Sequence, residues 1–173
     1  DRSDALNSAF SGERDLGIFF YYTPKAIQKT LRHLVSAGLK GSGNYGMLGV
    51  GVFQGQTINR ADANENKHVI ARLAVPFSIG GQYVEAGISG YTGKYVVRTD
   101  EGILSAPEGV RDARAAGHFV LYPQPFGLEL EYNFGDGPQL AALNATTNAE
   151  GDTSYTGIVQ RRRLHGGRAL ASL

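Results

Sequence analysis

The sequence contains no cysteine and no tryptophan. Without cysteine the chain forms no disulfide, offers no thiol nucleophile and cannot build a zinc–thiolate site. An excess of either charge is also missing, because 17 basic residues stand against 16 acidic ones and the formal net charge is +1. A chain so balanced has no general affinity for nucleic acid or for an anionic membrane surface, so we expect no nucleic-acid partner.

Long apolar runs are missing as well, and none approaches the ~18 residues of a membrane helix. The opening residues, Asp1-Arg2-Ser3-Asp4, lack the pattern of a signal peptide, so we expect a cytosolic protein, a processed protein or a fragment. Glycine (24), tyrosine (9) and phenylalanine (8) are plentiful. This composition favours β structure with many turns, within one domain of 173 residues.

The most informative segment runs from residue 128 to residue 134, where apolar and polar residues alternate. In a strand, alternate side chains point to opposite faces. One face would then carry Leu128, Leu130, Tyr132 and Phe134, and the other Glu129, Glu131 and Asn133. This pattern is typical of a soluble two-layer protein and also of a membrane barrel with a wet lumen.

Weaker alternation recurs along the chain, at residues 14–22, 45–53, 67–75, 83–91, 117–122 and 154–160. Residues 24–37 differ, because Thr23 and Pro24 suit a helix start and Ile27, Leu31 and Leu34 recur at helical spacing. A strand within 23–41 is the alternative. The connections after residue 53 run long, short, long, short, long. The sequence therefore predicts an all-β, antiparallel sheet of about seven or eight strands with a short helix.

No catalytic constellation stands out in the sequence. The four histidines are scattered and do not have metal-ligand spacing. Glu129 and Glu131 would lie about 7 Å apart on one strand face. This spacing is compatible with the carboxylate pair of a glycosidase, but a water-exposed polar face is the simpler interpretation. We therefore expect no enzyme activity, no metal and no cofactor.

Four segments stand in order along the chain: Glu13-Arg14-Asp15-Leu16-Gly17, residues 48–56 (LGVGVFQGQ), residues 64–77 (NENKHVIARLAVPF) and the residues Glu129, Tyr132, Asn133, Phe134 and Gly135. Together they resemble the phosphate-selective porin O and P family of bacterial outer-membrane proteins. The resemblance implies a transmembrane β-barrel in the outer membrane, in contact with the lipid bilayer. It implies passive diffusion of phosphate or other small anions, and a homotrimer. Family barrels have about sixteen strands, so the resemblance also implies a fragment that corresponds to the C-terminal half.

The end of the chain departs from this family. Residues 161–173 are rich in arginine and do not form the amphipathic strand with a terminal aromatic residue on which such barrels commonly end. We therefore divide the chain into a porin-barrel portion, residues 1–160, and an atypical basic tail, residues 161–173.

Passage of anions requires cations on the watery face of the wall. Arg72 is the best candidate because its neighbours Val69, Ala71 and Leu73 occupy the opposite face, and His68 shares the face of Arg72. Four further cations, expected in a long connection that folds into the mouth, are Lys94, Arg98, Arg111 and Arg114. The remaining lumen-facing candidates are Glu85, Ser89, Glu129, Glu131 and Asn133, and the lipid-facing ones are Leu128, Leu130, Tyr132 and Phe134. A plain surface charge is the competing interpretation for each cation, and a general porin is nearly as compatible as a phosphate-selective one.

Two other architectures remain open. A soluble antiparallel β-sandwich or small barrel would act as a ligand-binding or partner-binding module and would pack the same apolar face inward. An eight-stranded membrane anchor would close on itself and would need a strand within residues 23–41.

Overall fold

The computed structural model describes residues 15–41, 46–56, 64–99, 102–103, 108–149, 151 and 153–173. The elements along the chain are β1 (Gly17–Tyr22), α2 (Lys25–Ser36), β2 (Leu48–Phe53), β3 (His68–Ile79), β4 (Gln82–Tyr95), β5 (Arg98–Thr99), β6 (Gly102–Ile103), β7 (Val110–Leu121), β8 (Gly127–Thr147) and β9 (Thr153–Ser172). The predicted all-β, antiparallel class with one short helix is confirmed.

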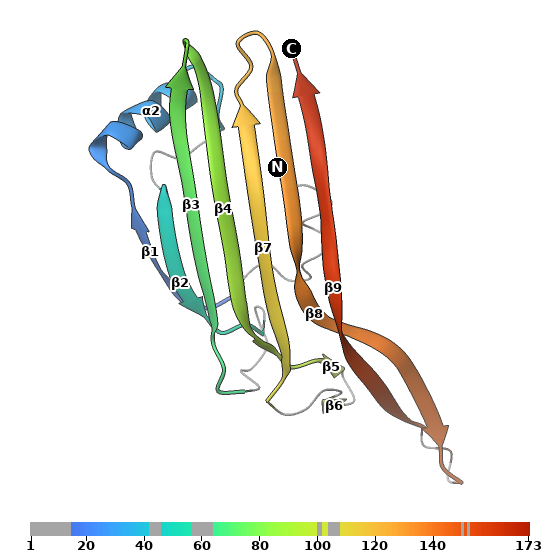
Figure 1. Ribbon diagram of the computed structural model, residues 1–173. Coiled ribbons are helices and arrows are strands. Elements are labelled where there is room, and N and C mark those ends of the chain that lie inside the picture. The colour runs from blue at the N-terminus through green and yellow to red at the C-terminus, as the bar shows by residue number, and fades with distance from the viewer. Residues whose placement is uncertain are drawn as a thin grey trace.

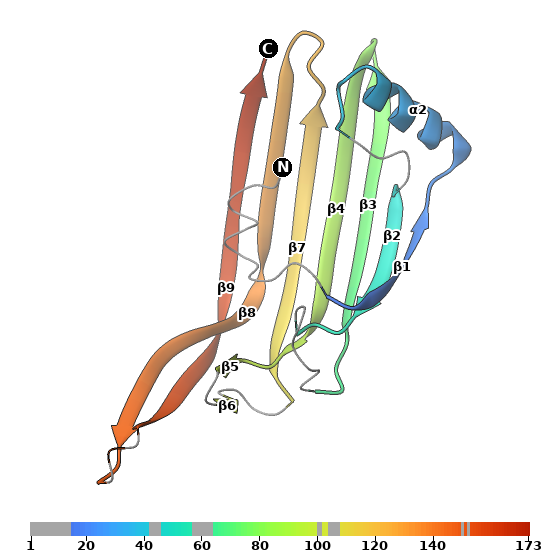
Figure 2. The same ribbon diagram turned by 180° about the vertical axis from the view of Figure 1, so that it is seen from behind.

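Seven strands form one antiparallel sheet in the order β1-β2-β3-β4-β7-β8-β9, and β5 and β6 form a separate two-stranded sheet. The strands lie side by side in a single layer, with β1 and β9 at opposite edges that do not meet (Figures 1 and 2). The described sheet is therefore open and is not closed into a barrel. Since each strand is antiparallel to its neighbour, the first and the seventh, β1 and β9, run in the same direction.

Most short and long connections lie at opposite ends of the sheet (Figure 1). The exceptions are the long β1–β2 link, which contains α2 and lies at the end with the short turns, and the short β8–β9 link at the other end. One end carries α2, the turn between β3 and β4, and the link between β7 and β8. Gly80 and Gly81 form that turn with φ values of 58° and 86°, a left-handed conformation that glycine adopts without strain. The links between β2 and β3 and between β4 and β7 lie at the other end. The link between β8 and β9 is shorter than the long connection that the sequence predicted, because β8 continues to Thr147 and β9 begins at Thr153.

The strands are also longer than the sequence predicts. β3 runs through Pro76 to Ile79, although residues 76–82 were expected to form a connection. Proline cannot donate to a strand ladder and is normally confined to edges. Here the β2–β3 pairing ends at Leu48 opposite Leu73, so Pro76 has a strand neighbour, β4, on one side only. Because β3 is an edge strand at this position, it can continue through the proline.

The basic end of the chain belongs to the sheet. β9 is continuous across residue 160 and pairs with β8 from Thr147↔Thr153 to Gly127↔Ser172. The predicted division at residue 160 thus falls inside one strand, and the segment 161–172 is part of the wall. Backbone pairing to β8 allows this arginine-rich stretch to be a strand without an amphipathic pattern of its own.

The helix α2 lies at the short-connection end and is not a strand, so the closed eight-stranded alternative loses the strand that it requires. Pro24 is the N-cap residue and makes no side-chain capping bond. Instead of capping the helix as predicted, the Thr23 hydroxyl accepts hydrogen bonds from the backbone N–H groups of Gly46 and Met47, at 2.7 and 3.1 Å. Leu31 and Leu34 are buried. No helix within the described ranges is long and apolar enough to cross a membrane.

Candidate functional site

The sheet presents an apolar face whose large side chains are exposed. The strand register places these side chains on one side of the sheet from β1 to β8. This apolar face consists of Ile18, Phe20, Tyr22, Val50, Val52, Val69, Leu73, Phe77, Ile88, Leu130, Tyr132 and Phe134. All four predicted lipid-facing residues lie on it, with Leu128 half-buried. Among the described residues no second sheet packs against this face (Figures 1 and 2).

The opposite face carries most of the charged and hydrogen-bonding side chains. Register pairs such as Arg72↔Ser89, His118↔Glu131 and Glu131↔Arg168 bring side chains from five strands together on it. This polar face consists of His68, Arg72, Glu85, Ser89, Tyr91, Asp112, Arg114, His118, Glu129, Glu131, Asn133 and Arg168. The predicted lumen-facing residues Glu85, Ser89, Glu129, Glu131 and Asn133 therefore share one face with Arg72.

Glu85 is the centre of one cluster on the polar face, and it is only 3% exposed. The Nζ of Lys40 lies 2.8 Å from Oε2 of Glu85, and the hydroxyl of Tyr122 donates to the same oxygen at 3.1 Å. The Nε2 of His118 lies 3.4 Å from Oε1. A guanidinium nitrogen of Arg72 is farther away, at 3.9 Å, and the Arg72 side chain is 52% exposed. The Glu85 carboxylate is therefore already contacted by Lys40 and Tyr122, and the positively charged side chain of Arg72 beside it stays half exposed.

Two further carboxylates on β8 are countered from β9. The guanidinium of Arg168 hydrogen-bonds to Glu129, and its Nε lies 3.5 Å from Oε2 of Glu131 at ion-pair distance. The side-chain amide of Asn133 donates to Oε1 of Glu131 at 2.7 Å. A cation therefore stands beside both members of the Glu129–Glu131 pair, and part of their charge is neutralised.

Asp112 organises a second cluster nearer the end with the long connections. The hydroxyl of Tyr91 donates to its Oδ2 at 2.9 Å, and Nε of Arg114 donates to its Oδ1 at 3.0 Å. The guanidinium of Arg114 also lies 6.0 Å from the centre of the Tyr91 ring, within the range of a cation–π interaction. Arg114 lies on the polar face within β7 and not in the connection where it was expected, with its charge held beside Asp112.

His68 lies on the predicted face but is buried rather than open to the lumen side. Its ring centre is 5.1 Å from that of Phe53 and 5.7 Å from that of Tyr91, with which it stacks. Gly55 and Gly93 make room for it, because a Cβ on either residue would collide with the imidazole. The His68 side chain is thus a packing element, and its Nε2 has no hydrogen-bond partner among the described residues.

Two of the predicted cations, Lys94 and Arg111, lie on the other side of the sheet from Arg72. Lys94 and Arg111 are cross-strand partners in β4 and β7, on the side of the apolar face and at the long-connection end. They lie in strands and not in a connection, because the β4–β7 ladder extends to Tyr95↔Val110. Arg98 lies in β5, and its side chain falls outside the described part of the structure.

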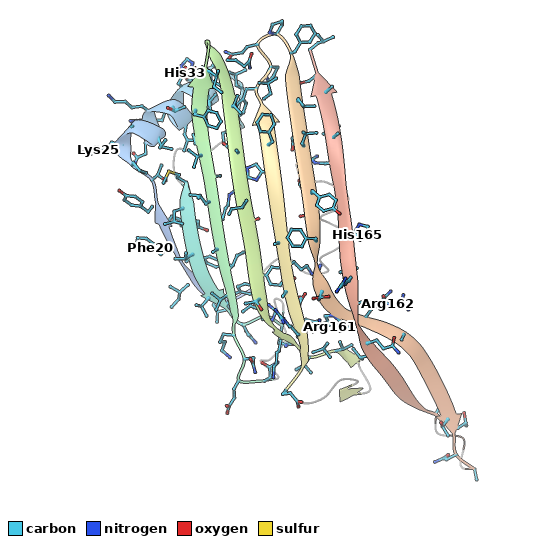
Figure 3. The ribbon with its side chains drawn as sticks, in the orientation of Figure 1. Phe20, Lys25, His33, Arg161, Arg162 and His165 are labelled. Atoms are coloured by element: carbon cyan, nitrogen blue, oxygen red, sulfur yellow. The ribbon has the colours of Figure 1, made fainter. Side chains whose placement is uncertain are left out.

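Sequence reasoning missed several residues of the polar face. The alternation of β7 could have placed His118, and a longer β9 could have placed Arg168. No local pattern indicates Lys40, which reaches Glu85 from the segment after α2. The helix itself carries an exposed basic stripe at i, i+4 and i+7, formed by Lys25, Lys29 and Arg32, and has no acidic residue. Figure 3 marks Lys25 and His33 on this helix, far from Arg161 and Arg162 in the lower half of β9.

Comparison of the chain with protein-family models, with curated proteins and with solved structures gave no match. The resemblance to the porin family therefore stays a prediction. The function has to be argued from the two faces of the sheet and from the contacts described above.

Proposed function

We propose that the chain forms part of the wall of an outer-membrane porin that lets phosphate or other small anions diffuse passively. One observation carries the proposal: a single sheet exposes a broad apolar face opposite a hydrogen-bonded charged face. Exposed apolar patches of this extent are rare on soluble monomers and mark interaction or membrane surfaces. A membrane barrel requires this arrangement, because its outer side contacts lipid and its inner side contacts water.

Strand length and connection pattern support the same proposal. β3 and β7 each have 12 residues and β4 has 14. A tilted strand needs about 9–11 residues to cross the hydrocarbon core of a bilayer. Outer-membrane barrels have short turns at the periplasmic end and long loops outside. By this comparison α2 and the Gly80–Gly81 turn lie at the periplasmic end.

The direction of the two edge strands supports the proposal that the described strands form only part of the porin wall. Unpaired strand edges are costly in hydrocarbon, so a spanning sheet has to close. β1 and β9 run in the same direction, and antiparallel closure therefore needs an odd number of further strands between them. A second copy with the same orientation in the membrane would offer only parallel edges. The described strands alone therefore do not complete the wall, and a homotrimer would be an assembly of completed barrels.

Arg72 is the residue that we propose to contact the anion. Its side chain is half exposed on the polar face, and among the described residues it makes one long ion pair, to Glu85. The planar fork of arginine forms two charge-assisted hydrogen bonds with a phosphate group. Glu85 and Asp112 on the same face are each paired with another cation, Lys40 and Arg114, so Arg72 is not needed to neutralise either of them.

The test uses the full chain, refolded with detergent and added to lipid vesicles and planar bilayers. We expect it to insert and to give discrete conductance steps whose reversal potential in a salt gradient indicates anion selectivity. Arg72→Gln should lower the selectivity, whereas Arg111→Gln, a control on the other side of the sheet, should not. A chain that is monomeric and monodisperse in plain buffer would contradict membrane insertion. If the chain inserts but gives no conductance, the proposed channel function is wrong and only the membrane-spanning sheet remains supported.

A further inference from the structure

We propose that Lys40 determines the anion selectivity of the polar face by neutralising Glu85, which leaves Arg72 available to bind an anion. This inference rests on the proposed function and adds to it a residue that does not itself contact the anion. Lys40 comes from the segment after α2 and not from the strands of the wall. Its role follows from the order of distances around one buried carboxylate.

Lys40 is the closest cation to Glu85. Its Nζ lies 2.8 Å from Oε2, whereas the guanidinium of Arg72 lies 3.9 Å from Oε1. The Glu85 side chain is 5% exposed and that of Lys40 is 26% exposed. A buried carboxylate without a compensating cation is strongly unfavourable. Within this cluster Lys40 therefore provides the main compensation, and Arg72 contributes a weaker ion pair.

Removal of the Lys40 charge would change the position and the field of Arg72. Glu85 would then be compensated mainly by Arg72, which in the described part of the chain is the other permanently charged cation within reach of it. A guanidinium drawn into a close pair with Glu85 has fewer N–H groups to offer to phosphate. The remaining net charge would also attract anions less, because a carboxylate a few ångströms away opposes the cation.

Lys40 is held in position by the helix and by the wall. The backbone N–H groups of Leu39 and Lys40 donate to the carbonyl oxygen of Leu34, at 2.9 and 3.1 Å. Leu34 is fully buried, so this segment is anchored. The Nζ of Lys40 also donates to the hydroxyl of Tyr122 at 3.2 Å. With its donors directed at Glu85 and Tyr122, Lys40 is a positioning residue and not the anion contact.

The experiment measures binding of inorganic phosphate to the full chain in detergent micelles by calorimetry. Lys40→Met should weaken binding about tenfold, the size expected for one uncompensated neighbouring charge. Lys40→Arg keeps the charge and should bind as the unmodified chain does. The double variant Lys40→Met with Glu85→Gln should restore binding, because no carboxylate is left to capture Arg72. In bilayers the anion-to-cation permeability ratio should follow the same order.

The outcomes separate this inference from the proposed function. If the unmodified chain inserts into bilayers but binds no phosphate and shows no anion selectivity, the proposed function fails. If it binds phosphate and Lys40→Met binds equally well, or if Glu85→Gln does not rescue the loss, only the role of Lys40 is wrong. Circular dichroism shows whether Lys40→Met folds. If it does not, the single variant Glu85→Gln decides, because it should bind phosphate at least as tightly as the unmodified chain, and weaker binding would overturn the inference.

Discussion

Leu130 and Glu131 are consecutive residues of β8 whose side chains lie on opposite faces of the sheet. Leu130 is 40% exposed on the apolar face, where no second sheet among the described residues covers it. The Glu131 side chain is 12% exposed and lies within reach of Arg168 and Asn133. The step from one residue to the next therefore crosses from the proposed lipid side of the wall to the proposed water side.

A pair of cysteine substitutions should report this difference. The chain contains no cysteine, so Leu130→Cys and Glu131→Cys each provide one unique labelling site. In lipid vesicles, a fluorophore at position 130 should be quenched by nitroxide-labelled lipids and one at 131 should not. A membrane-impermeant thiol reagent should instead react faster at position 131.

The same pattern should repeat at Ile88 and Ser89 in β4, which also lie on opposite faces. Equal quenching by lipid at both members of each pair would contradict a lipid-facing apolar side. Protection of position 130 from both the lipid probe and the aqueous reagent would instead favour the soluble alternative, in which this face is packed inward.

Substitution of Glu85 should destabilise the folded chain. Glu85→Gln removes the charge that Lys40, Tyr122 and His118 contact around a nearly buried site. Loss of charge-assisted hydrogen bonds of this kind costs about 1–3 kcal/mol. Urea titration of the micelle-bound chain should show that decrease in the free energy of unfolding. Glu129→Gln, at a side chain that is 39% exposed, is the matched control and should change it by less than about 1 kcal/mol.

Gly93 should not tolerate a side chain. A Cβ at this position would collide with the imidazole of the buried His68, so Gly93→Ala should cost about 1–3 kcal/mol of unfolding free energy through overpacking. Gly117→Ala is the control, because the nearest atom to its added Cβ would be 4.0 Å away. Addition of His68→Ala should recover part of the loss at Gly93. Equal losses at Gly93 and Gly117 would show that His68 does not fill the space described.

Deletion of residues 161–173 should speed up the hydrogen exchange of backbone amides in β8. The deletion removes the backbone partners of Gly127 to Pro138, which leaves β8 as the edge of the sheet over that length. Hydrogen exchange in micelles should therefore become faster for these β8 amides. Arg168→Gln, which removes the ion pairs but keeps the backbone ladder, should leave exchange nearly unchanged. Unchanged exchange after the deletion would show that the basic segment is not paired.

The sequence predicted much of the fold because the signals for it are local. Alternation identified the seven segments around which β1, β2, β3, β4, β7, β8 and β9 form, and helical spacing identified α2. Strand ends were predicted less well. β4 and β7 continue through Lys94 and Arg111, and β9 continues through the arginines after Gln160, because a neighbouring strand supplies hydrogen bonds whatever the side-chain pattern.

The candidate site was predicted in part. Arg72, Glu85 and Glu131 were placed on a common face from alternation alone, since a strand repeats every two residues. The burial of His68 was not predicted, because it depends on glycines at positions 55 and 93 that come from two other segments. Lys40 and Tyr122 were missed because their contacts with Glu85 join segments far apart in the chain.

The sequence by itself determined that this protein is an antiparallel β protein in which most strands have one apolar and one polar face. Alternation along a strand is enough to decide this, since adjacent side chains must point in opposite directions. Only the tertiary structure decided which charges neutralise one another and which stay open. That outcome depends on strand register and on the position of the segment after α2, which bring Lys40 to Glu85 and leave Arg72 half exposed.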